Sequence, residues 1–167
     1  VTEITSWQGL DLMQTVGRVM AEYENLPMSL RPSEILVDSI GVGGGVVDRL
    51  RELGAPVRGI NVGESPAMGK TYMNLRAELW FKTKAWLEDR SCKLPDNDQL
   101  LSELTAIRYS FTSSGKMKAE SKDEMRKRGL KSPDLADALC LTMASDAATA
   151  LSGAMSGWKK AIKRNLK

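Results

Sequence analysis

The chain has 167 residues, of which 42% are hydrophobic and 27% are charged. These values are typical of one globular domain with a single core, and they exclude an intrinsically disordered chain. No apolar run approaches the roughly 20 residues that a membrane helix needs. The N-terminus, Val1 to Thr5, lacks the basic start and the apolar stretch of a signal peptide. We therefore expect neither a membrane protein nor a secreted one.

The side-chain inventory excludes several kinds of catalytic site. There is no histidine, so histidine general-base catalysis, a Ser-His-Asp triad and metal ligation by histidine are excluded within this chain. The two cysteines, Cys92 and Cys140, are too few for a zinc site and are expected to be reduced and packed. The net charge of +3 is too small to indicate nucleic-acid binding by itself.

The first half of the chain is typical of a βαβ unit. The expected segments are a strand or strand end at residues 1–7, a helix at 10–23, a strand at 34–38, a short helix at 46–53 and a strand at 56–62. The strand at 34–38 is a short apolar run that ends in an acid, which indicates a buried parallel strand. A glycine-rich loop is expected at residues 41–45, and Gly54 fits a helix C-terminal cap. No Gly-Lys-Ser/Thr ending follows this loop, so no nucleotide site is expected.

The second half is predicted to be mainly helical, with one hairpin. The expected segments are helices at 72–90 and 98–105, a hairpin of 107–112 and 117–120, a basic helix at 121–128 and a final helix from 132–134 to about 151. Asp96 is a plausible cap for the second of these helices. Two glycines, Gly153 and Gly157, precede a last basic cluster. We therefore divide the chain into a domain at residues 1–152 and a basic tail at 153–167.

Three aspartates are the candidate catalytic and metal-binding residues. Asp38 ends the buried strand where open α/β sheets place ligands, although it can instead cap the loop or the next helix. Asp134 and Asp137 open the final helix and project from neighbouring points of one face. Acids in a first turn can instead favour the helix dipole and cap free amides. Asp137 lies in an otherwise apolar helix start, where a carboxylate needs a partner or a metal.

A basic run at residues 116–131 suggests a surface that binds phosphates. The candidate DNA-binding residues are Lys116, Lys118, Lys122, Arg126 and Lys127. The alternative is a solvated helix face. Glu120, in the same stretch, can reach the acids or form a surface pair. No aromatic residue interleaves with this run, so base stacking is not expected and the tryptophans are assigned to packing.

Four stretches, in this order, carry a family resemblance: residues 35–50 (ILVDSIGVGGGVVDRL), 72–80 (YMNLRAELW), 120–124 (ESKDE) and 132–139 (SPDLADAL). Together they resemble the C-terminal nuclease domain of tailed-phage terminase large subunits. The Ser-Pro-Asp-x-x-Asp-Ala-Leu stretch is the most specific signal for the family. The strand with its glycine-rich loop would be a much weaker signal by itself. The resemblance covers roughly residues 1–150.

The resemblance implies an α/β, ribonuclease H-like fold, with a mixed sheet flanked by helices and lacking its first strand or strands. It implies an endonuclease domain that cuts concatemeric viral DNA during genome packaging, with acids that bind two Mg²⁺ or Mn²⁺ ions. Asp38 matches the family's acid at the end of the central strand, and Asp137 is favoured over Asp134 for the acid of the last helix. The implied partners are double-stranded DNA, the terminase small subunit and the portal, in the cytoplasm of the bacterial host.

The resemblance has one gap, because the family's first metal-binding aspartate lies on a strand before the point where this chain begins. No acid here has that context, since Glu3 precedes a helix and Asp11 lies at its start. We therefore expect weak activity from this chain alone. Two alternatives stay open: a catalytically impaired DNA-binding or assembly fragment of the packaging motor, and a related ribonuclease H-like resolvase or integrase nuclease.

Overall fold

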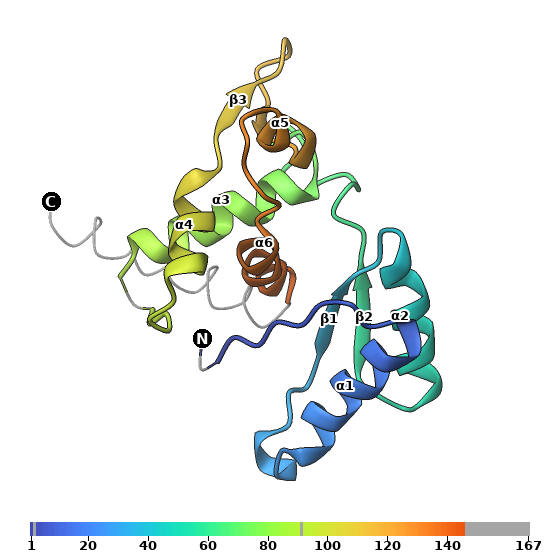
Figure 1. The fold of residues 1–167 in the computed structure, drawn as a ribbon. Helices are drawn as coiled ribbons and strands as arrows, with labels where there is room; N and C mark the ends of the chain where they lie inside the picture. Colours follow the sequence, from blue (N-terminus) through green and yellow to red (C-terminus); the bar gives the residue numbers. More distant parts are fainter. Residues whose placement is uncertain (2, 91, 146–167) are drawn as a thin grey trace, which may run out of the picture.

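The structure is a computed structural model that describes residues 1, 3–90 and 92–145 (Figure 1). Its α-helices are α1 (Leu12–Asn25), α2 (Val42–Glu52), α3 (Leu75–Glu88), α4 (Asp98–Ala106), α5 (Lys122–Lys127) and α6 (Asp134–Leu141). Its strands are β1 (Ile35–Asp38), β2 (Val57–Ile60), β3 (Tyr109–Phe111) and β4 (Met117–Ala119). Two 3₁₀ turns, η1 (Met28–Leu30) and η2 (Thr142–Ala144), complete the described elements.

A parallel pair, β1 and β2, stands between two helical layers (Figure 1). Ile35 and Val37 pack into a cluster with α1 and α2, around the buried Val16, Val46 and Leu50. Leu36, between them in sequence, packs instead against the cluster formed by α3, α4 and α6. Because side chains alternate along a strand, Asp38 lies on the same face as Leu36, toward α6. The predicted βαβ unit is confirmed.

The helices α3, α4 and α6 bury the larger cluster, which contains Leu79, Leu100, Ala136 and Leu139. Cys140 belongs to it, and burial raises the pKa of its thiol to about 12, so this cysteine stays protonated and unreactive. Both cysteines are free, as expected.

The antiparallel hairpin β3–β4 and the short helix α5 form one end of the molecule, near the first turn of α3 (Figure 1). The hairpin turn is made by residues 112–116, and Gly115 has a positive φ of 77°, which favours glycine. Ser121 caps α5 by accepting the backbone N–H of Glu124. Hydrogen bonds from Lys118 and Ser121 lower the pKa of Glu124 to about 2. The predicted hairpin and basic helix are confirmed, as separate elements from the parallel pair.

Several predicted boundaries are wrong. Residues 1 and 3–7 form no strand, because none of the described segments pairs with them, and the N-terminal amine instead donates to the Lys93 carbonyl. The cap of α4 is Asn97 rather than Asp96, because the extended backbone of Asn97 brings its side-chain oxygen to the Leu100 N–H. Within the described residues, which end at 145, the final α-helix stops at Leu141 and is followed by η2.

The predicted continuation of the last helix beyond residue 145, the domain boundary at 152 and the basic tail lie outside the described residues. In the part of the chain that the structure describes, no helix has the length and apolar character needed to cross a membrane.

Candidate functional site

Asp38 is positioned by the close approach of α2 to the end of β1. The helix starts at Val42, so the predicted loop at residues 41–45 is wrong. Of these five residues, only Gly41 lies outside the helix, at its N-cap, with a positive φ of 65°. The glycines that follow allow the first turn of α2 to rest on the strand end, and Gly43 touches the main chain of Asp38. The Asp38 carboxylate is exposed, and its Oδ1 accepts the Ile40 N–H at 3.1 Å. That hydrogen bond is the loop-capping role that the sequence left open.

Asp134 and Asp137 lie in the first turn of α6 without capping it. The N-cap position is Pro133, which has no side-chain oxygen to offer. The free amide of Ala136 is instead satisfied by Glu103 of α4, whose Oε2 accepts it at 2.9 Å. The capping interpretation of the two aspartates therefore has no support in the described contacts, although both still gain from the helix dipole.

One cavity of about 840 Å³ is lined by residues from β1, α3, β4, α5 and α6. Its polar lining residues include Asp38, Asn74, Arg76, Lys118, Ser121, Lys122, Asp134 and Asp137. The three predicted aspartates thus line the same cavity, on the α6 face of the parallel pair. Among the described residues, however, no three acidic or cysteine side chains are close enough together to hold a metal ion. Metal ligation by these aspartates stays a prediction.

The Asp137 carboxylate is held mainly through one of its oxygens. Oδ1 accepts from Arg76 Nε at 3.2 Å and Nη2 at 3.0 Å, and from the indole Nε1 of Trp80 at 2.9 Å. Oδ2 lies 3.5 Å from the Lys122 amine. The Asp137 side chain is only 22% exposed, whereas that of Asp134 is 73% exposed and has its ion pair with Lys122, also at 3.5 Å. Asp137 is therefore the better-ordered acid of the pair.

Glu120 does not join the acids. Its carboxylate binds Arg128 at 2.6 Å and accepts the Arg108 N–H at 3.1 Å. The hydrogen bonds from Arg128 keep the pKa of Glu120 below its ordinary value. Its backbone carbonyl, in contrast, accepts Arg76 Nη1 at 2.6 Å and so ties the end of the hairpin to α3. Glu120 therefore forms an ion pair, as the alternative predicted, but the pair is partly buried rather than on the surface, because the Glu120 side chain is only 9% exposed.

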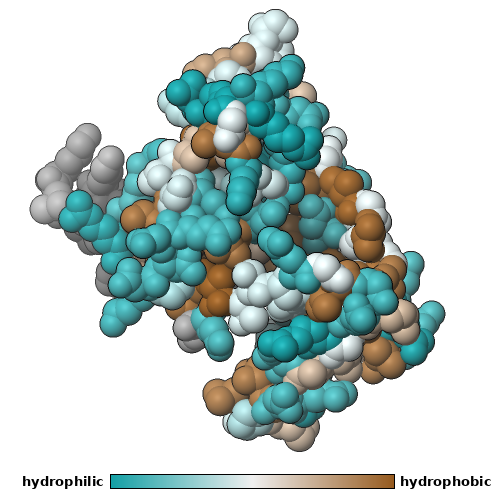
Figure 2. All heavy atoms as spheres, viewed as in Figure 1, coloured by the Kyte–Doolittle hydropathy of each residue, from teal (hydrophilic) through white to brown (hydrophobic). Residues whose placement is uncertain are grey.

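The predicted DNA-binding residues divide into two groups. Lys118 and Lys122 line the cavity of the aspartates, and the Lys118 amine also binds Glu124 at 2.9 Å. Arg126 pairs with Asp123 on the exposed surface of α5, next to Lys127, and Lys116 lies at the hairpin turn. The surface over α5 is hydrophilic in the space-filling view (Figure 2). Phosphate binding by these residues stays a prediction.

Arg76 and Trp80 were missed as site residues by the sequence analysis, which placed the tryptophan among packing residues. Their four-residue spacing on α3 puts both on one face, and this spacing was the available signal. Nothing in the local pattern shows that this face meets Asp137.

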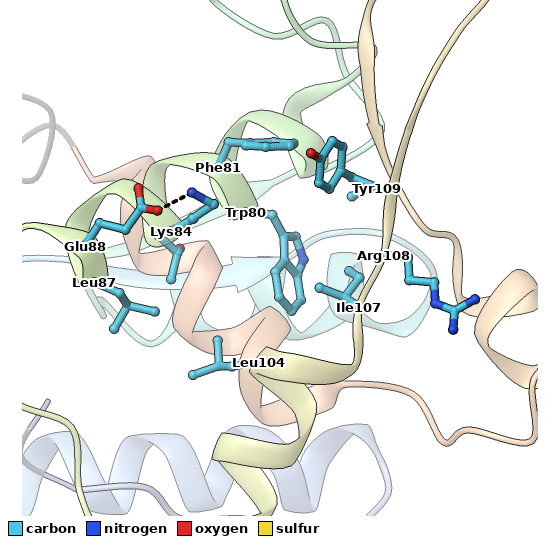
Figure 3. Close-up of a pocket in the computed structure, with 11 residues that line it drawn as sticks. Trp80, Phe81, Lys84, Leu87, Glu88, Leu104, Ile107, Arg108 and Tyr109 are labelled. Carbon is cyan, nitrogen blue, oxygen red and sulfur yellow. Dashed lines mark hydrogen bonds and ion pairs between the residues drawn. The ribbon is translucent and has the colours of Figure 1, made fainter.

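A second, mainly apolar cavity of about 350 Å³ lies on the other side of Trp80. Figure 3 shows the Trp80 ring pointing into it, near Leu104 and Ile107. Its one acid, Glu88, is paired with Lys84. Trp80 therefore combines the expected packing role with a polar contact to the site.

No protein-family model and no curated protein sequence matches the chain. Solved structures do match it. A variant nuclease domain of the large terminase subunit gp2 of bacterial virus Sf6, with manganese and β-thujaplicinol, has a TM-score of 0.62 and 22% identity over 80% of this chain and 72% of that one. Another structure of the nuclease domain of Sf6 gp2 has a TM-score of 0.59 and 23% identity over 80% of this chain and 70% of that one.

A further match is the large terminase nuclease of the thermophilic phage G20c with bound magnesium, with a TM-score of 0.55 and 20% identity over 80% of this chain and 62% of that one. The agreement extends over most of the described residues, and at this level of identity it establishes the fold. The chain has the ribonuclease H-like α/β fold of the nuclease domains of phage large terminase subunits.

Proposed function

We propose that the chain is a divalent-metal-dependent endonuclease domain that cuts concatemeric viral DNA during genome packaging. The observation that carries the proposal is that Asp38 of β1 and Asp137 of α6, remote in sequence, line one cavity together with Lys118 and Lys122. The fold likeness to terminase nucleases, some of them with manganese or magnesium, supports it. The terminase small subunit and the portal are the partners proposed with it, in the cytoplasm of the bacterial host.

The donor chemistry of the cavity fits a hard divalent cation. Carboxylate oxygens are the ligands that Mg²⁺ and Mn²⁺ prefer. We assign Asp38 and Asp137 to hold such ions, with Asp134 as a further direct or outer ligand. When bound, a pair of ions would activate a water molecule and stabilise the leaving 3′ oxygen.

The chain's own residues bind and orient the DNA. We assign Lys118 and Lys122, which line the wall of the cavity, to the phosphates beside the scissile bond. Phosphate contacts carry no sequence information, so we propose contact that is largely independent of sequence. This chemistry needs no histidine, in agreement with its absence from the sequence.

Plasmid cleavage with Mg²⁺ or Mn²⁺, together with Mn²⁺ titration calorimetry, tests the proposal on the full chain. Asp38→Ala and Asp137→Ala are each expected to abolish cutting and to weaken Mn²⁺ binding. The matched control is Asp48→Ala, because Asp48 is an exposed aspartate on α2 that pairs only with Arg51 in the described contacts and lies outside the cavity. Cutting that survives both substitutions would refute the proposed site.

A second candidate function is a DNA-binding or assembly module that does not cut. It is favoured by the finding that the described residues bring no three acids close enough to hold a metal ion. Salt-sensitive DNA binding without metal-dependent cleavage in the same assay would support it. Cleavage of four-way junctions in preference to linear and supercoiled DNA would instead indicate a resolvase.

A further inference from the structure

We propose that Arg76 and Trp80 form a clamp on Oδ1 of Asp137, which leaves Oδ2 as the oxygen offered to a divalent cation. The two residues are positioning residues in this proposal, since they act through Asp137. The inference rests on the proposed function for its cation, whereas the clamp itself is a feature of the chain.

The two oxygens of Asp137 have different surroundings. Oδ1 receives three N–H groups at 2.9–3.2 Å, two from the Nε and Nη2 atoms of Arg76 and one from the Trp80 indole. A carboxylate oxygen has two lone pairs, so these donors fill its capacity. Oδ2 has the Lys122 amine at 3.5 Å, which is too long for a strong hydrogen bond. The free lone pairs of the carboxylate are therefore those of Oδ2.

The clamp is rigid because both donors are fixed on α3. Arg76 and Trp80 lie one turn apart, and the guanidinium stands 5.7 Å from the centre of the Trp80 ring. Trp80 is only 7% exposed, and its ring packs beside Leu104 and Ile107 (Figure 3). Its place in the core cluster of α3, α4 and α6 restricts the ring and so favours the direction of the indole N–H toward Asp137.

Arg76 also joins the acid to the end of the molecule that carries the proposed DNA-binding residues. Its Nη1 donates to the Glu120 carbonyl at 2.6 Å, directly before the Ser121 cap and Lys122 of α5. One guanidinium therefore sets the distance between α6, which carries Asp137, and the segment that carries Lys122. Loss of Arg76 is therefore expected to weaken the attachment of both α6 and the Lys122 segment to α3.

Contacts of this kind behind a metal ligand change metal affinity or activity by about 10–100-fold when they are removed. We therefore expect Arg76→Lys to weaken Mn²⁺ binding by about 10-fold or more, because a lysine amine cannot contact Oδ1 of Asp137 and also reach the Glu120 carbonyl as the planar guanidinium does. Trp80→Phe keeps most of the ring and removes the N–H, and a smaller weakening is expected. Arg51→Lys is the matched control, since Arg51 pairs with Asp48 on the exposed face of α2.

The clamp itself is tested without metal, by the indole ¹H–¹⁵N cross-peaks of the full chain. Trp80→Phe identifies the Trp80 peak by its loss. Asp137→Ala and Arg76→Lys are each expected to move this peak and to speed its exchange with water, whereas Arg51→Lys leaves it in place. A Trp80 peak unmoved by Asp137→Ala overturns the clamp.

The two proposals fail in different ways. If the wild-type chain binds Mn²⁺ through Asp38 and Asp137 but Arg76→Lys binds it equally well, the clamp has no positioning role and the inference is wrong, while the proposed function stands. A lower unfolding temperature of Arg76→Lys with unchanged Mn²⁺ affinity would show a purely structural role and would overturn it too. If the wild type binds neither Mn²⁺ nor Mg²⁺, the proposed function fails first.

Discussion

Gly43 lies directly against the main chain of Asp38, at the junction between α2 and β1. A β-carbon on Gly43 would stand 1.8 Å from the Asp38 carbonyl oxygen and 2.9 Å from its carbonyl carbon. Atoms that are not bonded cannot approach so closely, so this contact requires glycine. The helix can therefore rest on the strand end, and the position of the acid depends on a residue five places further along the chain.

We predict that Gly43→Ala displaces Asp38 and destabilises the protein. The methyl group meets backbone rather than a flexible side chain, so α2 or the end of β1 must move. Overpacking of this kind costs about 1–3 kcal/mol. Urea denaturation measures the free energy of unfolding, and Mn²⁺ calorimetry measures the effect on the proposed site, which is expected to weaken.

Gly17→Ala provides the control, because Gly17 lies inside α1 and an added β-carbon there meets nothing within 4 Å. Alanine is favoured over glycine within a helix by about 0.5–1 kcal/mol, so this variant is expected to gain stability. A Gly43→Ala protein as stable as the wild type, with unchanged Mn²⁺ affinity, would show that the contact has no influence on the site.

Asp137→Asn and Asp137→Ala are predicted to differ in stability and to agree in activity. Alanine leaves the Arg76 guanidinium, which is 15% exposed, without its carboxylate, at a cost of about 1–3 kcal/mol. Asparagine keeps an oxygen for Arg76 and Trp80 and is expected to cost less. Neither carries the negative charge that holds a cation, so both are expected to lose plasmid cleavage. Cleavage by Asp137→Asn at the wild-type rate would remove Asp137 from the proposed site.

The parts of the site that follow from local pattern were predicted from the sequence. The apolar run before Asp38 correctly identifies a parallel strand, although this strand is only partly buried, and its side-chain alternation determines the face on which the acid lies. The apolar surroundings of Asp137 indicated correctly that it needs a partner, and its partners prove to be Arg76, Trp80 and Lys122.

The parts that depend on tertiary contact were not predicted. Three consecutive glycines disfavour a helix by intrinsic propensity, and the contact between Gly43 and β1 overrides that preference. Residues 1–7 have a strand-like composition, yet a strand also needs a hydrogen-bonded neighbour. The role of Arg76 requires α3, α6 and the end of β4 to meet, which no window of sequence contains.

The contact between Lys118 of the hairpin and Glu124 of α5 is predicted to stabilise the protein less at acidic pH. The pKa of Glu124 is lowered from 4.5 to about 2, chiefly by the hydrogen bond from Lys118. A carboxyl group whose pKa falls on folding stabilises the folded state above its unfolded pKa, and this contribution is lost as the pH falls toward the folded value. The stabilisation by Glu124 is therefore complete above about pH 4.5 and disappears toward about pH 2.

Thermal unfolding of the wild type and Glu124→Gln across this pH range measures the effect. The midpoint of the variant is expected to lie below that of the wild type at pH 7, and the two midpoints are expected to converge as the pH falls toward 2. Glu52→Gln is the control, because its ion pair with Arg49 is exposed, and such pairs contribute only about 0–1 kcal/mol. A difference between wild type and Glu124→Gln that is independent of pH would contradict the assignment.

Finally, Lys127→Gln is predicted to reduce the salt dependence of DNA binding. Lys127 lies on the exposed face of α5, outside the cavity of the aspartates, so its substitution tests the DNA surface without disturbing the acids. Each phosphate contact contributes about 0.9 to the slope of log K against log salt for duplex DNA, so the slope is expected to fall by about 1.

Lys84→Gln is the control, because it removes the same charge from α3, beside Glu88, on a surface that faces the apolar cavity. If α5 is only a solvated face, Lys127→Gln keeps the wild-type slope. An equal decrease of the slope in both variants would show that DNA binding responds to net charge alone. A defined DNA surface on α5 instead predicts a smaller slope for Lys127→Gln and an unchanged slope for Lys84→Gln.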